Sequence, residues 1–228
     1  MVANCKNGIS SYEAGRALGV TQRTAWFMLH RIRKAMQDGS IVKLGGSVEV
    51  DETFIGGKAR NMHLAQRQRR ITGTGTKDKT AVMGFLERGG KVRTMVVPNR
   101  RKHILQAEVK KHVAAGAALY TDALPSYNGL RARYAHEVID HATAYVDGKI
   151  HTNGLENFWS LLKREISGTY VSVEPFHLFR YLDEQTFRYN HRKHNEGERF
   201  LEVAGMVAGK RLTWNQMTGK GVQLDATA

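Results

Sequence analysis

The chain has 228 residues, and its 41% hydrophobic content is enough to bury a core, which argues against wholesale disorder. Its 35 Lys and Arg residues against 21 Asp and Glu give a formal net charge of +14, an excess that suits nucleic acid, with a membrane surface as the rival partner. A ribosomal-type protein would be equally basic, so the charge alone leaves that class open. No apolar run approaches the roughly 18 residues of a spanning helix. Cys5 is the only cysteine, which excludes an internal disulfide framework and a zinc site built on several thiolates. The start of the sequence lacks a secretory pattern, so a cytoplasmic location is expected.

Residues 9–36 are predicted to form two helices joined by a tight turn. Serine residues offer N-caps for the first helix, and Thr21 offers one for the second. The second helix keeps apolar residues at helical spacing, namely Ala25, Met28, Leu29, Ile32 and Met36. A glycine-containing linker follows, so we expect a small helical module over residues 1–44 and a second domain over residues 45–228.

The second domain alternates between strand and helix patterns. The segments that predict strands are Ser47–Ile55, Thr80–Leu86, Lys91–Val97, Ala117–Thr121 and Glu137–Ile139. Helices are predicted over residues 101–115, 153–167 and 176–190. Three early strands, a helix, a strand and then helices indicate an α/β domain with a mixed sheet flanked by helices.

Two acidic residues stand in or at the end of apolar strands, where a charge is disfavoured unless something pairs with it. Asp51 lies within the first predicted strand, and Asp122 follows the short strand that contains Tyr120. A solvent-facing position at a sheet edge explains Asp51 equally well, and a turn residue before Pro125 explains Asp122 equally well. Because α/β sheets usually place ligand sites at strand ends, both acids are candidates for a functional site.

Glu156 lies in a predicted helix whose apolar and polar faces separate cleanly. The polar stripe consists of Asn153, Glu156, Ser160 and Lys163. At about 1.5 Å rise per residue, Glu156 and Lys163 are about 10 Å apart along the axis, so a metal-binding acid would share its stripe with a cation suited to a phosphate. Taken alone, this stripe is better explained as an ordinary solvent-exposed helix face than as a metal site, because the helix dipole favours a Glu near the N-terminus.

The three acids together predict a metal site. Two carboxylates from strands and one from a helix can converge on a pair of Mg²⁺ or Mn²⁺ ions, which prefer hard oxygen ligands. Such a pair stabilises both the attacking and the leaving oxygen of an in-line phosphoryl displacement. The expected cofactor is therefore two ions of Mg²⁺ or Mn²⁺, held by Asp51, Asp122 and Glu156.

The ordered motifs resemble those of DDE transposases of bacterial insertion sequences, in the group with a ribonuclease H-like catalytic core. They are Val50-Asp51-Glu52-Thr53-Phe54-Ile55-Gly56-Gly57-Lys58, then Tyr120-Thr121-Asp122, then His151-x-Asn153-x-x-Glu156-x-x-Trp159-x-x-x-Lys163. The 33 residues between Asp122 and Glu156 are typical of this family. The resemblance covers nearly the whole chain, and it implies a ribonuclease H-like fold, metal-dependent cleavage at element ends and strand transfer into target DNA.

The resemblance also implies roles for individual residues. The three acids would be the catalytic metal ligands, Asn153 a secondary candidate ligand and Lys163 a DNA contact. Residues Ile9–Lys34 resemble a helix-turn-helix, although a helical hairpin that merely packs on the core is the alternative. In the helix-turn-helix interpretation, base edges are contacted by Gln22, Arg23 and Thr24, and phosphates are contacted by Arg31. The implied partner is double-stranded DNA, both the terminal inverted repeats and the target, and joining two ends implies at least a dimer in the DNA complex.

Further basic residues are predicted to contact the DNA backbone. Seven Lys or Arg residues and one acid lie from Lys58 to Lys79, a run that is either a solvated loop or an arm that orders on DNA. A later cluster mixes histidine with Lys and Arg around residue 191, which favours a phosphate-binding surface over a metal site. The predicted contacts are Lys58, Arg67, Arg69, Arg70, Lys163, Arg164, Arg188 and Arg192.

The sequence departs from the family in one respect and leaves two other functions open. Relatives often carry an N-terminal cysteine-rich zinc-binding module, whereas this sequence begins at the helix-turn-helix pattern with one cysteine. The alternatives are a metal-dependent nuclease on the same fold and a helix-turn-helix regulator with an inert core. A requirement for divalent metal separates the enzymes from the regulator, and the joining of pre-cut ends separates the transposase from the nuclease.

Overall fold

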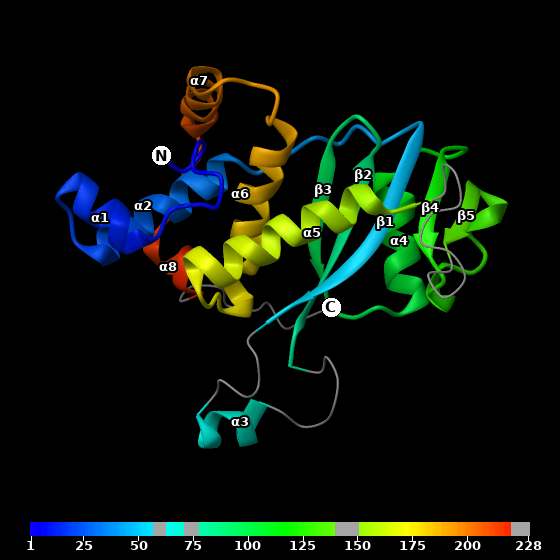
Figure 1. The fold of residues 1–228 in the computed structure, drawn as a ribbon, viewed down its shortest axis with the longest axis horizontal. Helices are drawn as coiled ribbons and strands as arrows, with labels where there is room; N and C mark the ends of the chain where they lie inside the picture. Colours follow the sequence, from blue (N-terminus) through cyan, green and yellow to red (C-terminus); the bar gives the residue numbers. More distant parts are fainter. Residues whose placement is uncertain (57–62, 71–77, 140–150, 220–228) are drawn as a thin grey trace.

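The computed structural model describes residues 1–56, 63–70, 78–139 and 151–219, and its centre is a five-stranded mixed sheet (Figure 1). The strands are β1 (Ser47–Ile55), β2 (Thr80–Glu87), β3 (Val92–Val97), β4 (Ala118–Asp122) and β5 (Ala135–Ile139). Their order is β3-β2-β1-β4-β5, in which β1, β2 and β3 pair antiparallel and β4 pairs parallel with both β1 and β5. The predicted α/β class with a mixed sheet is confirmed.

Two helices cover opposite faces of this sheet (Figure 1). Helix α4 (Lys102–His112) packs on one face, where Val48 and Val50 of β1 belong to its core cluster. Helix α5 (Asn153–Glu165) packs on the other face through an apolar side that includes Trp159. Because successive strand residues point to opposite faces, the odd-numbered positions of β1 face α5, and Asp51 is one of them.

Most of the remaining helices gather beside the β3 edge of the sheet (Figure 1). Helix α6 borders β3, and its Asn190 side chain hydrogen-bonds both the N–H and the carbonyl group of Val92. Phe187 of α6 packs in one apolar cluster with residues of the N-terminal helices. The remaining helices are α1 (Ser11–Leu18), α2 (Gln22–Ala35), α3 (Leu64–Arg70), α6 (Leu178–Asn190), α7 (Glu196–Val207) and α8 (Trp214–Thr218), with a π-helical turn at Ile166–Tyr170 and 3₁₀ turns at Pro125–Tyr127, Leu130–Ala132 and Pro175–His177.

The predicted caps of the two N-terminal helices are present. The Ser10 side chain accepts a hydrogen bond from the Glu13 N–H at 3.1 Å, and the Thr21 side chain accepts one from the Thr24 N–H at 3.2 Å. Gly19 adopts a left-handed conformation with φ 65°, which a residue without a Cβ atom allows at little cost. The prediction of two helices joined by a tight turn is therefore confirmed.

Two helix boundaries differ from the sequence prediction for reasons of tertiary structure. The helix expected over 101–115 ends at His112, because Val113 turns to an extended conformation and forms a parallel bridge with Leu44. The helix expected over 153–167 is α-helical only to Glu165 and continues as a π-helical turn. Both differences involve partners distant in sequence, which local periodicity does not encode.

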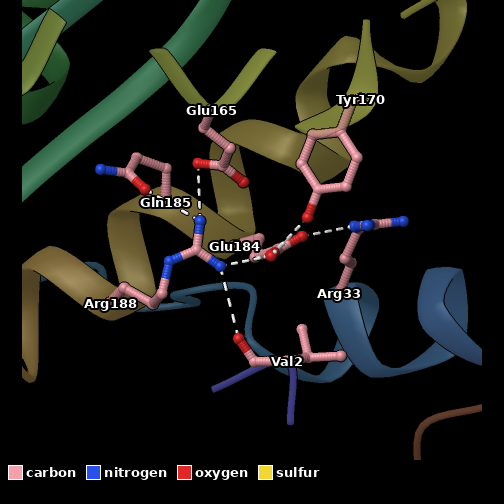
Figure 2. Close-up of polar contacts among 7 residues, drawn as sticks. All are labelled: Val2, Arg33, Glu165, Tyr170, Glu184, Gln185 and Arg188. Atoms are coloured by element: carbon pink, nitrogen blue, oxygen red, sulfur yellow. Dashed lines mark hydrogen bonds and ion pairs between the residues drawn. The ribbon is translucent and has the colours of Figure 1, made fainter. Parts of the chain in front are cut away.

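A buried ionic network joins the N-terminal helices to the rest of the molecule (Figure 2). Glu184 of α6 is its centre and is fully buried. Its carboxylate accepts hydrogen bonds from Arg33 Nε at 2.6 Å, from Tyr170 Oη at 2.8 Å and from Arg188 Nη1. Arg188 also pairs with Glu165 at the end of α5, at 2.6 Å. The network therefore connects α2, α5, the π-helical turn and α6.

The electrostatic balance of this network favours the ionised form of Glu184. Burial acts to raise the pKa of the Glu184 carboxyl, but the charges of Arg33 and Arg188 outweigh it and lower the pKa. Arg33 is 1% exposed and has few alternatives to this partner. Removing the central charge would thus leave a buried cation without its counter-ion.

We expect Glu184→Gln to lower the free energy of unfolding by about 3–5 kcal/mol, the usual cost of breaking a buried ion pair on one side. Chemical denaturation followed by circular dichroism measures the change. Glu137→Gln, at an exposed position of β5, is the matched control and should stay within about 0.5 kcal/mol of the parent. Equal stability of the two variants would contradict a structural role for the network.

Candidate catalytic site

Three acidic residues from three elements approach one another at the face of the sheet covered by α5. Asp51 lies in the middle of β1, and Asp122 is the last residue of β4, the parallel neighbour of β1. Glu156 lies in the first turn of α5. The negative charges of Asp122 and Glu156 both act on the carboxyl of Asp51. The three residues that the sequence pattern singled out are therefore electrostatic neighbours.

Asp51 is held in place by two hydrogen bonds. Its Oδ2 accepts from the indole Nε1 of Trp159 at 2.9 Å, and its Oδ1 accepts from the backbone N–H of Glu52 at 2.8 Å. Burial nevertheless raises the pKa of Asp51 to about 6, and the charges of Asp122 and Glu156 add to that effect while the hydrogen bonds oppose it. No described cation offsets this negative charge strongly enough to restore the usual pKa.

Glu52 is a fourth acidic residue at this point of the sheet, and the sequence interpretation did not assign it a role. Burial, together with the charges of Asp122 and Asp51, raises its pKa to about 8, and the charge of Arg100 opposes them. Its Oε1 is buried and has no hydrogen-bond partner among the described residues. Glu52 thus adds to the excess of acidic groups around Asp122.

Glu49 fixes the helix that carries Glu156. Its Oε2 accepts a hydrogen bond from the Leu155 N–H at 3.1 Å, in the first turn of α5, where Thr152 provides no side-chain cap. Its Oε1 pairs with Arg88 Nε at 2.9 Å, and Glu49 is only 1% exposed. The sequence interpretation missed this residue, although its position two residues before Asp51 places both side chains on the same face of β1.

Two glycines allow α5 to approach the sheet closely. A Cβ atom on Gly84 of β2 would lie 2.6 Å from Cζ2 of Trp159, the residue that binds Asp51. A Cβ atom on Gly154 would collide with Leu86 and lie 2.8 Å from Oε2 of Glu49. The absence of side chains at these positions therefore determines the distance between the Asp51 strand and the Glu156 helix.

The chemistry of these side chains fits a hard divalent cation. All are oxygen donors, and the negative charges of Asp122 and Glu156 add to the burial that raises the pKa of Asp51. Within the described parts of the chain, no three His, Cys, Asp or Glu side chains are close enough together to form a metal site in this arrangement. Asn153, the secondary candidate, is the first residue of α5 and is exposed.

The predicted DNA-contacting residues of the catalytic half occupy different environments. Lys163 and Arg164 are exposed on α5, with Lys163 on the same stripe as Glu156. Arg192 is exposed just after α6, whereas Arg188 lies in the buried network and is 8% exposed. Arg67 is exposed on α3. Lys58 lies outside the described residues, as do the side chains of Arg69 and Arg70.

The residues predicted to meet base edges lie at the start of α2 and are exposed, as is Arg31 further along the helix. Gln22 donates a hydrogen bond to Ser11 Oγ at 2.8 Å, which connects the two N-terminal helices. The guanidinium group of Arg23 lies 4.4 Å from the ring centre of Trp214 in α8. Thr24 Oγ1 lies 2.9 Å from Thr21 Oγ1.

In the metal-free protein, we expect Asp51 and Glu52 to contribute a loss of stability as the pH rises from about 4 to about 8. Asp51 and Glu52 have raised pKa values of about 6 and about 8, so the folded state binds their protons more tightly than the unfolded state does. Each pKa unit corresponds to about 1.4 kcal/mol. Urea unfolding in EDTA at several pH values should show a flatter dependence for Asp51→Asn/Glu52→Gln than for the parent. Parallel curves would contradict the raised pKa values.

Glu49→Ala should destabilise the protein by about 3 kcal/mol, because it removes the acceptor of the Leu155 N–H and the carboxylate that pairs with Arg88 Nε. Glu49→Gln retains an acceptor oxygen and should cost less. Thermal and urea unfolding measure both effects, with Glu137→Ala on the surface of β5 as the control. A cost for Glu49→Gln equal to that for Glu49→Ala would indicate that the charge pairing, and not the helix cap, stabilises this contact.

Comparison with known proteins identifies the family. The ISXO2-like transposase domain family matches residues 43–190. An uncharacterized transposase-like protein of Haemophilus influenzae is 32% identical over 101 residues, which cover 44% of this chain and 81% of the relative. An uncharacterized protein in transposable element ISH50 of Halobacterium salinarum is 27% identical over 163 residues, 66% of this chain and 54% of that relative, so the chain spans about half of its length. None of the described helices is long and apolar enough to cross a membrane. Since the family match covers well over half of the sequence, the chain belongs to the ISXO2-like transposase domain family.

Proposed function

We propose that this protein is a DNA transposase that cleaves DNA at the ends of its element and joins those ends to target DNA. The observation that carries the proposal is the mutual influence of Asp51, Asp122 and Glu156, which come from β1, β4 and α5. Membership of a transposase family supports the reaction class. The mixed sheet, with its strand order β3-β2-β1-β4-β5, supports a ribonuclease H-like catalytic core.

The three acids are proposed as ligands for two Mg²⁺ or Mn²⁺ ions, with Asn153 as a secondary candidate. Bound ions would stabilise the charge on the attacking and leaving oxygens of the phosphoryl displacement. Trp159 and the Glu52 N–H hold Asp51 in one orientation, while Asp122 and Glu156 are only partly buried and can adjust their rotamers.

The chain's own residues would place the DNA strand. Lys163 is exposed on the stripe of α5 that carries Glu156, two turns further along, and its ammonium group is suited to a phosphate beside the acids. In the first step, water attacks the phosphorus and the 3′-oxygen leaves. In the second step, the freed 3′-hydroxyl attacks a phosphorus of the target strand, forming a new P–O bond as the bond to the target's own 3′-oxygen breaks and that oxygen leaves. Acting on two ends at once calls for a dimer or a larger assembly on DNA.

Helices α1 and α2 are proposed as a helix-turn-helix that binds the terminal repeats. Both helices are capped, a left-handed glycine separates them, and the start of α2 is exposed. Gln22, Arg23 and Thr24 would meet base edges, and Arg31 would meet phosphates. The buried pairing of Arg33 with Glu184 fixes this unit to α6. Arg188 of α6 in turn pairs with Glu165 of α5, the helix that carries Glu156.

We expect Asp51→Asn to reduce Mg²⁺-dependent cleavage of DNA that carries the element ends by about 10³-fold or more, since losing several kcal/mol of metal-ion stabilisation has that effect on a rate. A gel assay with labelled DNA measures it. Asp38→Asn, at an exposed acid outside the site, is the control and should cleave like the parent. Unchanged cleavage by Asp51→Asn would remove the catalytic assignment.

Two further measurements separate the alternatives. Millimolar Mg²⁺ should raise the unfolding temperature of the parent and of Asp38→Asn more than that of Asp51→Asn, because an ion bound to the folded state stabilises it. DNA with pre-cut ends should give joined products with a target duplex. Cleavage without any joining would favour a nuclease, and binding without a response to metal would favour a regulator.

A further inference from the structure

A pocket of about 430 Å³ lies where the segment before α1 meets α5, α6 and α7. Its lining includes four cationic residues and two other polar or aromatic ones, namely Lys6, Arg188, Arg192, Arg199, Asn157 and Tyr189. No Asp or Glu of the described residues lines it. The charge of the lining is therefore wholly positive, which suits an anionic ligand.

Three of the four cations keep their charge available. Arg188 is paired with Glu165 and Glu184 in the buried network. Among the described residues, no carboxylate lies within ion-pair distance of Lys6, Arg192 or Arg199. By contrast, the two nearby histidines, His191 and His194, share Glu202 as their partner. The pocket therefore carries positive charge that no described carboxylate offsets at Lys6, Arg192 or Arg199.

The two arginines are already oriented by neutral partners. Arg192 Nη1 donates to the Tyr189 carbonyl oxygen at 2.8 Å, and its guanidinium group lies 4.3 Å from the Tyr189 ring centre. Arg199 Nε donates to Asn4 Oδ1 at 3.1 Å, while Asn4 itself donates to the Glu196 carbonyl oxygen at 3.2 Å. A guanidinium group has five N–H donors, so each arginine retains donors for a ligand after these contacts. Such preorganisation reduces the entropy lost on binding.

The pocket also has a donor that lacks a partner. Arg188 lines the pocket and is 8% exposed, and its Nε is buried with no hydrogen-bond acceptor among the described residues. Asn157, exposed on α5, provides a further polar group on the opposite wall.

We propose that this pocket binds phosphates of a DNA backbone, with Lys6, Arg192 and Arg199 as the residues that contact them. The inference rests on the proposed transposase function and adds a contact region that the acidic site does not contain. Asn157 follows Glu156 directly in α5, and consecutive helix residues point roughly 100° apart. The pocket and the acids therefore flank the same helix, and a duplex lying across α5 would contact both.

The salt dependence of DNA binding tests this proposal. Each protein–phosphate contact contributes about 0.9 to the negative slope of log K against log salt concentration. We expect the triple variant Lys6→Gln/Arg192→Gln/Arg199→Gln to have a salt slope smaller in magnitude by about 2.7. Between 50 and 200 mM salt, the parent's loss of affinity should therefore be about 40 times the loss of the variant. Fluorescence anisotropy with a 30-base-pair duplex of mixed sequence, in EDTA, measures binding without any cleavage.

The matched control is Lys110→Gln/Lys111→Gln/Arg131→Gln, which removes three exposed cations elsewhere, two of them on α4 across the sheet, and should retain the parent slope. If the first triple variant folds poorly, Lys6→Gln/Arg192→Gln, at two exposed positions, should still lower the slope by about 1.8. A change in the salt slope below 0.9, or an equal change in the control variant, overturns the proposal. A pocket that held a free phosphorylated molecule in place of the DNA backbone would give this result. The assay contains no metal, so its outcome does not depend on whether Asp51, Asp122 and Glu156 are catalytic. If the parent protein bound no duplex at all, both this proposal and the proposed transposase function would be contradicted.

Discussion

The hydrogen bond from the Leu155 N–H to Glu49 is the contact on which the geometry of the site depends. It ties the start of α5 to β1, and Arg88 pairs with the other oxygen of the Glu49 carboxylate. Asp51 lies two residues further along the same strand face and binds Trp159 of the same helix. One strand therefore supplies the first acid and also positions the helix that carries the third. The glycines at 84 and 154 permit this contact because side chains there would hold the helix away.

The far end of α5 is fixed by a different kind of interaction. Glu165 pairs with Arg188, which in turn pairs with Glu184, and Arg33 of α2 completes the network (Figure 2). Buried ion pairs of this kind are demanding, because each charge has lost its hydration and depends on its partners. The consequence is a definite placement of the N-terminal helices relative to the acids. A protein that must recognise DNA at one position and cut it at another benefits from such a fixed relation.

The two signs of charge are segregated around α5. Asp51, Asp122 and Glu156 lie on one side, where burial, with the charges of Asp122 and Glu156, raises the pKa of Asp51. Cations without carboxylate partners among the described residues line the pocket on the other side, and the chain as a whole carries a net charge of +14. Phosphodiester chemistry requires both properties, since the backbone must be attracted while the reacting phosphate needs ligands for a divalent cation. The arrangement of charge thus agrees with the proposed function more specifically than the net charge alone.

The sequence by itself determined the elements and the candidate acids. Alternating β-branched residues and the turn at residues 87–90 predicted the β2–β3 hairpin, and the caps Ser10 and Thr21 predicted the first two helices, because these signals act between neighbours in the chain. Only the tertiary structure decided that α4 stops at His112, that Trp159 binds Asp51 and that Glu49 caps α5. It also decided that Arg188, a basic residue among other basic residues in the sequence, is buried between two carboxylates. At the candidate site, these contacts join residues up to 108 positions apart in the sequence. The sequence pattern shows periodicity and local helix caps, but it does not show which distant residues come into contact.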